Sequence, residues 1–190
     1  LPPGPAVAGI IASTDRARGC WKSPAGMEAT VAGATGLSRP VTASDQDLLN
    51  PEGVCCLRQD SVTSPVRVWG ARTLASAGHA EWRYIAVRRM ALALRNSLGR
   101  GLLWTVFEPN DSRLWASLVQ TVGSMLSGLF RQGAFQGQTG KDSFYVRCGL
   151  GVTMSQADID AGRAIVELGF APLKPAEFVV LRISCKAGSA

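Results

Sequence analysis

The chain has 190 residues, 46% of them hydrophobic, which is enough for one well-buried core and at most two small ones. Only 18% of the residues are charged, below the roughly 25% usual in a soluble domain, so either the interior is large or partners cover part of the surface. The net charge of +6 favours an anionic partner, and because the basic residues form no dense run we expect an acidic protein surface rather than nucleic acid. No apolar stretch has the roughly 18 residues that cross a bilayer and residues 1–4 do not resemble a signal peptide, so we expect no direct membrane contact.

The first third of the sequence predicts short elements. Residues 5–18 begin with proline and end in a basic turn before Gly19, which predicts a short helix. Residues 30–40, rich in Gly, Ala and Thr, are expected to form a strand followed by a loop. Residues 44–50 begin with a helix N-cap signal at Ser44 and predict about two helical turns. Residues 54–57 and 66–69 are short apolar runs between turn residues and predict a pair of strands.

The remaining sequence predicts two long helices and several strands. Apolar residues recur every three or four positions from Tyr84 to Leu98 and again over 114–130, where a wide apolar face predicts burial against a sheet. Residues 102–107, 143–148, 165–170 and 178–184 predict strands, and 156–162 a short helical turn. The last strand alternates apolar and polar residues, as a half-exposed strand does. Two long helices among five or six strands predict a mixed α/β or α+β fold, in a single domain over residues 1–190.

The cysteines and the chain start bear on where the protein folds and how long it is. Five cysteines form an odd number and no pair has zinc-site spacing, which argues against a disulfide framework or a metal site and favours a reducing, cytosolic place of folding. Cys55 and Cys56 lie in an apolar run, which predicts two buried thiols. The chain begins without methionine in Pro/Gly-rich sequence, and we expect it to be part of a longer protein.

A search for catalytic chemistry finds no convergent set of groups. His79 is the only histidine and lies in a small-residue loop, where a solvated side chain is far more common than a catalytic base. The glycine-rich stretch 133–140 precedes Lys141, but Asp142 stands where a phosphate loop needs Ser or Thr. Glu108 lies before a turn and is expected to stabilise it. We therefore expect no enzyme, no cofactor and no metal; a small nucleotide-binding α/β enzyme remains the alternative.

Two adjacent arginines interrupt the first long helix. Arg88 and Arg89 either form a solvated face whose stems cover apolar surface, or make salt bridges at a subunit contact. The sequence does not decide between these interpretations.

Five segments taken in order resemble the C-terminal portion of contractile tail sheath proteins, the family of phage tails, R-type bacteriocins and phage-like contractile injection systems. They are residues 68–74, 82–89, 104–110, 114–115 and 171–179, and residues 2–10 and 21–25 resemble the family's entry into this region. The resemblance implies that the following motif residues are structural or lie at subunit contacts: Trp69, Gly70, Arg72, Thr73, Trp82, Tyr84, Arg88, Arg89, Glu108, Pro109, Asn110, Trp115, Pro175, Ala176, Glu177, Phe178, Val180 and Arg182.

The resemblance also implies a biological role. Sheath proteins form stacked rings, six-fold in the family, around an inner tube, and contract to drive that tube through a target envelope. The implied partners are other copies, the inner tube, and baseplate and terminator proteins, with assembly in the bacterial cytoplasm and the finished protein in a phage tail or injection particle. The N-terminal arm and outer domain would precede Leu1. Extended arms augment a neighbour's sheet in this family, so the strand at 178–185 is expected to join copies, as donor or as acceptor.

Overall fold

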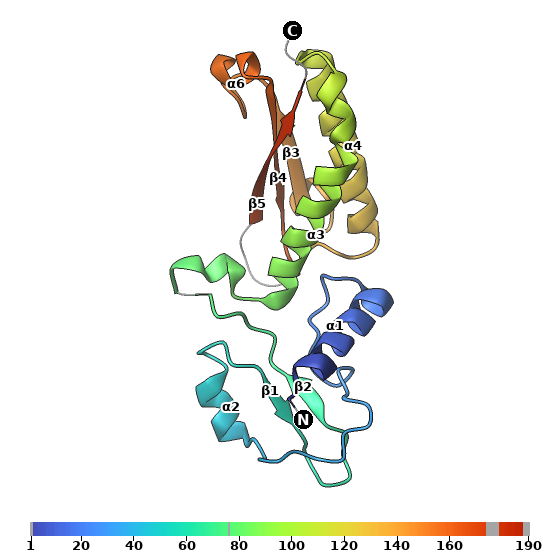
Figure 1. The fold of residues 1–190 in the computed structure, drawn as a ribbon, viewed down its shortest axis with the longest axis vertical. Helices are drawn as coiled ribbons and strands as arrows, with labels where there is room; N and C mark the ends of the chain where they lie inside the picture. The colour runs from blue at the N-terminus through green and yellow to red at the C-terminus, as the bar shows by residue number, and fades with distance from the viewer. Residues whose placement is uncertain (1, 76, 174–178, 188–190) are drawn as a thin grey trace. The chain divides into compact units, whose positions relative to one another are not determined.

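The computed structural model describes residues 2–75, 77–173 and 179–187, and every structural statement below concerns these residues (Figure 1). The chain divides into two compact units, Leu1–Met90 and Ala91–Ala190, and buried apolar residues gather around a small hairpin in the first and beside a larger sheet in the second. The single domain over residues 1–190 stays a prediction. Helix α3 (Ile85–Gly101) contributes residues to both units.

The first unit is rich in loops and is held together by short elements. Its elements before α3 are α1 (Gly4–Arg18), α2 (Ala43–Leu49), β1 (Cys56–Arg58), β2 (Arg67–Trp69) and the 3-10 segment η1 (Ala77–Trp82). The predicted helix at 5–18 and the strand pair are confirmed, the strands pairing antiparallel. Helix α2 is also confirmed, but its N-cap is Thr42 rather than Ser44. The Thr42 hydroxyl accepts from the N–H of Asp45, whose carboxylate accepts from the N–H of Thr42 in return.

The predicted strand at 30–40 is wrong. Thr30 forms one isolated antiparallel bridge with Arg67, and no further residue of this stretch pairs as a strand. Gly33 adopts a φ of 75°, which turns the chain away from an extended path.

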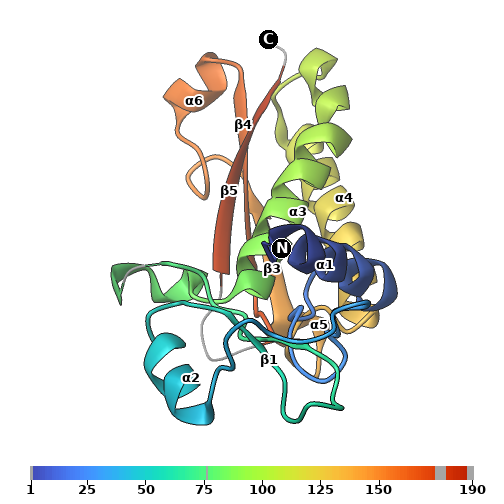
Figure 2. The same cartoon turned by 60° about the horizontal axis from the view of Figure 1, so that its bottom comes forward.

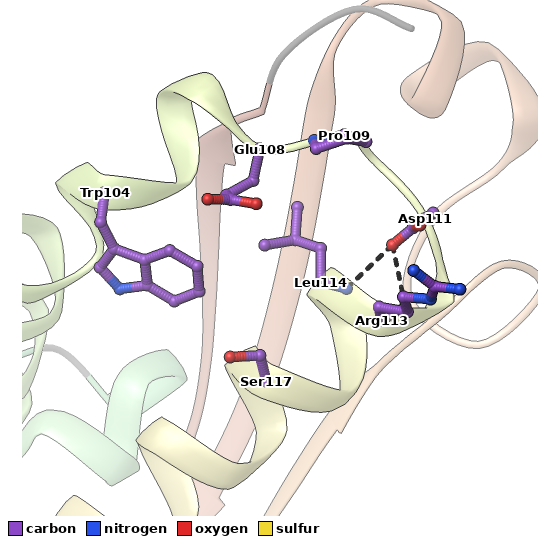
Figure 3. Close-up of a pocket in the computed structure, with 7 residues that line it drawn as sticks. All are labelled: Trp104, Glu108, Pro109, Asp111, Arg113, Leu114 and Ser117. Atoms are coloured by element: carbon purple, nitrogen blue, oxygen red, sulfur yellow. Dashed lines mark hydrogen bonds between the residues drawn. The ribbon is translucent and has the colours of Figure 1, made fainter.

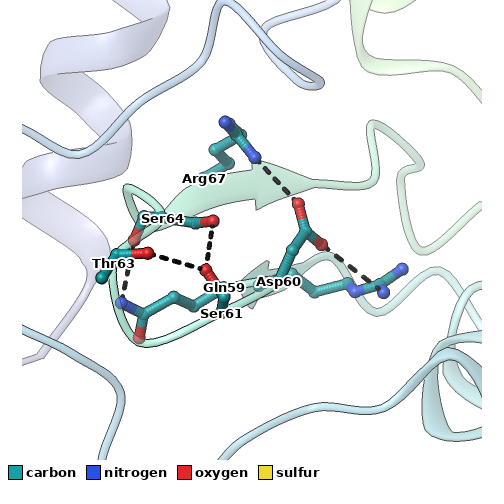
Figure 4. A network of polar contacts seen from close by, with 7 residues as sticks. Gln59, Asp60, Ser61, Thr63, Ser64 and Arg67 are labelled. Carbon is teal, nitrogen blue, oxygen red and sulfur yellow. Dashed lines mark hydrogen bonds and ion pairs between the residues drawn. The ribbon is translucent and has the colours of Figure 1, made fainter.

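The turn between β1 and β2 is closed by polar contacts (Figure 4). Arg67 donates to Asp60 at 2.9 Å, and the Gln59 amide donates to the carbonyl oxygen of Ser64 at 2.9 Å. The hydroxyls of Ser61 and Ser64 lie 2.8 Å apart. These bonds satisfy the polar side chains of a turn whose apolar residue Val62 is exposed, so the hairpin keeps a defined shape without burying it.

The second unit is a three-stranded antiparallel sheet with two long helices. Strand β4 (Arg163–Phe170) lies between β3 (Phe144–Cys148) and β5 (Val179–Lys186), as the predicted strands at 143–148, 165–170 and 178–184 require. Figures 1 and 2 show α3 and α4 (Ser112–Arg131) side by side along the sheet. Short helices complete the unit: η2 (Leu103–Phe107), α5 (Gly140–Ser143) and α6 (Gln156–Asp160).

The core of this unit follows the predicted apolar stripes. Side chains fully shielded from solvent come from α4 and from the face of β4 that alternates with its polar residues. The residues with 0% exposure there are Leu118, Val122, Leu126, Ala164, Val166, Leu168 and Phe170.

The predicted strand at 102–107 is wrong, because this stretch forms the 3-10 helix η2. Within η2 itself only Thr105 is buried, and its hydroxyl donates to the carbonyl oxygens of Leu102 and Lys186, both at 2.9 Å. Leu103 and Phe107 are exposed instead, at 65% and 91%. A run of apolar residues predicts burial, but here one polar residue anchors the segment and most of the apolar ones face outward.

Candidate functional site: the open edge of strand β5

Strand β5 has a partner on one side only among the described residues. It pairs with β4 in a register that joins Glu167 to Arg182 and Arg163 to Lys186. The N–H of Ala187 donates to the carbonyl oxygen of Gly162 at 2.8 Å, which fixes the alternation of hydrogen bonds along the two strands. Arg182 is thereby a member of a non-hydrogen-bonded pair, and its main-chain N–H and C=O point away from β4.

The same alternation sets the length of this open edge. Val180 and Ser184 also direct their main-chain groups away from β4, since they lie two residues either side of Arg182. The carbonyl oxygen of Lys186 accepts from the Thr105 hydroxyl, so η2 closes the end of the edge. We define the open edge of β5 as residues 180–184.

The opposite edge of the sheet, strand β3, has fewer main-chain groups free to hydrogen-bond with a further strand. Strand β3 has five residues against eight in β5, and the N–H of its first residue, Phe144, already donates to Gly140. The outward main-chain groups of residues 180–184 make no such bond among the described residues, so the open edge of β5 is the better place for a further strand to hydrogen-bond.

Apolar side chains along β5 are incompletely covered. Leu181 and Ile183 face the core yet are half-buried, whereas Leu168 and Val166, which pair with them on β4, are 0% exposed. The difference is what an edge position produces, because no strand lies beyond β5 to shield them among the described residues. A strand added there would remove apolar surface from water.

The outward face of the sheet carries a row of charges. Arg147, Glu167 and Arg182 occupy the same level on β3, β4 and β5. Arg182 Nε donates to Glu167 Oε2 at 2.8 Å, and the hydroxyl of Tyr145 lies 3.4 Å from Glu167 Oε1. The guanidinium of Arg147 lies over the Tyr145 ring, 4.9 Å from its centre. Burial, and then the negative charge of Glu167, raise the pKa of Tyr145, which keeps its phenol protonated.

Two members of this row differ in exposure. The side chain of Glu167 is only 12% exposed, while that of Arg182 is 77% exposed. Arg182 thus binds the buried carboxylate through Nε and extends the rest of its guanidinium toward solvent at the sheet edge. Sequence reasoning included Arg182 but missed Glu167, Arg147 and Tyr145, which the register of β3 and β4 brings to one face of the sheet.

The motif residues of the first unit bond to other residues of the same unit. Arg72 donates to the carbonyl oxygen of Asn50 at 3.0 Å and forms an antiparallel bridge with Tyr84. The Thr73 hydroxyl donates to the carbonyl oxygen of Trp82 at 2.7 Å. Gly70 has a φ of 123°, which favours glycine, and a Cβ added there would make a tight contact of 3.2 Å with the Cα of Cys55. These residues therefore stabilise the path into α3.

Trp69 and the arginine pair also make contacts inside the chain. Trp69 lies beneath the guanidinium of Arg58, and Trp82 beneath that of Arg88, 5.4 and 4.9 Å from the ring centres. Arg89 binds Asp15 of α1 in a bidentate pair, with Nη1 2.6 Å from Oδ1. Arg89 thus makes its salt bridge within the chain, and the place of the arginine pair at a subunit contact stays a prediction.

The predicted motif at 108–115 holds the start of α4. Asn110 donates to the carbonyl oxygen of Arg163 at 3.2 Å and accepts from the Trp115 indole at 2.9 Å, joining α4 to β4. Asp111 caps the helix by accepting from the N–H groups of residues 113 and 114.

A hollow of about 410 Å³ lies beside this motif (Figure 3). The Glu108 carboxylate points into it, and the Glu108 main chain caps η2 through Thr105. The lining offers no histidine or cysteine to complete a catalytic set with that carboxylate. It consists of Trp104, Glu108, Pro109, Asp111, Arg113, Leu114 and Ser117.

The phosphate-loop candidate before Lys141 and the lone histidine, His79, lie as follows. Gly137 has a φ of 135° and a side chain there would collide with Ser143, so the loop before α5 is packed against its own helix rather than open to a phosphate. His79 is exposed and lies 3.6 Å from Glu81. Within residues 2–75, 77–173 and 179–187, no group of three metal-ligating side chains gathers, and no helix is long and apolar enough to cross a membrane.

The prediction of two buried vicinal thiols is half wrong. Cys56 is buried, but Cys55 is exposed and its thiol donates to the carbonyl oxygen of Arg72. Burial raises the pKa of Cys148 to about 11, and burial also raises that of Cys185. Four of the predicted motif residues lie outside the described residues: Pro175, Ala176, Glu177 and Phe178.

Comparison with known proteins accounts for nearly the whole chain. Residues 79–186 match the family described as phage tail sheath C-terminal domain, and residues 1–74 match the phage tail sheath protein central domain. A prophage major tail sheath protein of Pseudomonas aeruginosa strain UCBPP-PA14 is 30% identical over 177 residues, which are 90% of this chain and 42% of that protein.

Two solved structures are similar to nearly the whole chain. A chain of the anti-feeding prophage baseplate is 37% identical with a TM-score of 0.84, and covers 96% of this chain and 50% of its own length. A chain of the contracted PVC sheath complex, from an extracellular contractile injection system, is 35% identical with a TM-score of 0.84, over 96% of this chain and 51% of its own. The present chain thus spans about half the length of the relatives it matches.

Proposed function

Because the chain belongs to the phage tail sheath family, we propose that it is part of a sheath subunit that polymerises as stacked rings around an inner tube and contracts to drive that tube through an envelope. The observation that carries the proposal is that both family matches, the prophage tail sheath protein and the chain of the contracted sheath complex agree over nearly every residue. The relatives are about twice as long, which supports the proposal that the whole subunit also has an N-terminal arm and an outer domain before Leu1.

The role proposed is structural rather than catalytic. A prophage tail sheath protein and a chain of a contracted sheath complex are among the relatives, and the hollow beside α4 has neither histidine nor cysteine in its lining. The proposed partners are other copies of the subunit, the inner tube and the baseplate, with assembly in the bacterial cytoplasm before the particle is complete.

The open edge of β5 supports a way of joining copies. Main-chain hydrogen bonds between strands of different copies survive rigid-body movements that exchange side-chain contacts, which a contracting polymer needs. In this proposal β5 is the acceptor, because it already pairs with β4 of its own chain and leaves residues 180–184 open.

Electron microscopy of the full-length protein tests the proposal. Negatively stained tubes or stacked rings of uniform diameter are expected at high protein concentration. Dispersed particles at the same concentration, with or without the inner tube protein, would count against a sheath role.

A further inference from the structure

The charge row on the sheet specifies what can dock beside β5. We infer that the strand which occupies the open edge of β5 is an extended segment bearing a carboxylate opposite Arg182, flanked by apolar residues opposite Leu181 and Ile183. This inference rests on the proposed function, because the segment is taken to belong to another copy of the subunit. It adds the chemistry and the register of that segment.

The carboxylate follows from the state of Arg182. Its Nε is bound to Glu167 Oε2 at 2.8 Å, and its side chain is 77% exposed at the edge of the sheet. The row Arg147–Glu167–Arg182 therefore ends in positive charge on β5. In a widened sheet, the residue directly opposite Arg182 would lie close enough to interact with it, and opposite charges are favourable there while like charges are unfavourable.

The apolar flanks follow from the core side of the strand. Leu181 and Ile183 point to the opposite face from Arg182 and are half-buried, although their partners on β4 are fully buried. Because side chains alternate along any strand, a segment with its acidic residue opposite Arg182 presents its two neighbours to the core face. Apolar residues at those positions would cover Leu181 and Ile183.

The same row argues against edge-to-edge pairing of two such sheets. Arg147 lies on one edge strand and Arg182 on the other, at the same level. Pairing β5 of one copy with β3 or β5 of another in the register that aligns these levels would place two arginines opposite each other, and like charges opposite each other disfavour that register. A separate acidic segment avoids this repulsion.

Zero-length crosslinking of assembled full-length protein tests the inference. Arg182→Lys places an amine opposite the carboxylate expected on the docking segment. Carbodiimide should therefore form an amide between position 182 and an Asp or Glu of another copy. Mixing isotope-labelled and unlabelled protein identifies inter-copy crosslinks by mass spectrometry. Arg147→Lys is the matched control, because it introduces the same amine beside Glu167 but on the β3 edge, and we expect roughly tenfold less inter-copy product there.

A charge reversal gives a second, independent readout. Arg182→Glu and Arg147→Glu each put a second carboxylate opposite Glu167, but only Arg182→Glu repels the docking segment. Because Arg182→Glu also removes the bond to Glu167, thermal unfolding of both unassembled variants is measured beside assembly, and assembly is compared at a temperature where both are folded. We expect Arg182→Glu to raise the protein concentration needed for assembly about tenfold over Arg147→Glu. Tubes that form with no inter-copy crosslink at position 182, or with equal effects of the two reversals, overturn the inference alone. If the wild-type protein forms no tubes, the proposed function fails.

Discussion

A glycine-to-alanine change at position 169 tests the packing of the charged sheet face. Gly169 lies on β4, and the ring of Tyr145 covers it so closely that an added Cβ would overlap Cε1 and lie 2.7 Å from Cζ. The ring would have to move, which disturbs its contacts with Glu167 and Arg147. Overpacking of this kind costs about 1–3 kcal/mol, and the loss of glycine flexibility returns about 0.5–1 kcal/mol. The net expectation is a destabilisation of about 0.5–2 kcal/mol.

Urea unfolding followed by circular dichroism measures this change. The control is Gly123→Ala in α4, where an added Cβ meets no atom within 4 Å and the helix should gain about 0.5–1 kcal/mol. A second control is Tyr145→Ala, in whose background Gly169→Ala should become neutral or stabilising. If Gly169→Ala is as stable as the wild type, or if removal of the ring leaves its cost unchanged, the described packing of this face is wrong.

Three further predictions concern the first unit, the short helix α6 and the thiols. A double-mutant cycle with Asp15→Asn and Arg89→Gln, followed by urea unfolding, should give a coupling of about 1 kcal/mol, since the pair is bidentate but partly exposed; additive effects would contradict the described pair. Hydrogen bonds from Ser155 lower the pKa of Asp158 below 3.8, so the stability that this carboxylate contributes is present above pH 3.8 and is lost as the pH falls through the lower folded-state pKa. Asp158→Asn should therefore reduce the loss of stability between pH 5 and 2, as thermal unfolding measures it. An unchanged pH profile would argue against the capping box. Iodoacetamide at pH 8 should modify exposed Cys55 about tenfold faster than Cys148, whose thiol is kept protonated, as peptide mass spectrometry can follow; equal rates would show that Cys148 is not buried as described.

Much of the second unit follows from its sequence. The two stripes of α4 and the alternation along the last strand predict which side chains meet the core. Leu118 and Leu126 are fully buried, and Leu181 and Ile183 of the last strand face the core. Such patterns are readable because a packed face repeats the same choice every two or four residues. The family matches confirm the resemblance. One of its motif residues, Asn110, joins two elements by bonding the start of α4 to β4.

The errors arose where one contact outweighs the local pattern. Residues 102–107 read as a buried strand, but the bond from Thr105 to Lys186 is made across 81 positions and holds a 3-10 helix with Phe107 exposed. The salt bridge between Arg89 and Asp15 likewise joins residues far apart, so the sequence left the role of the arginine pair open. The row of Arg147, Glu167 and Arg182 needed the strand register before its members could be seen together.

A density map of the assembled polymer at near-atomic resolution tests the central claim most directly. We expect the sheet of each second unit to contain a fourth strand, contributed by another copy and hydrogen-bonded to residues 180–184 of β5. A polymer in which this edge faces solvent, with copies joined only through side chains, would contradict the proposal that β5 links the sheath subunits.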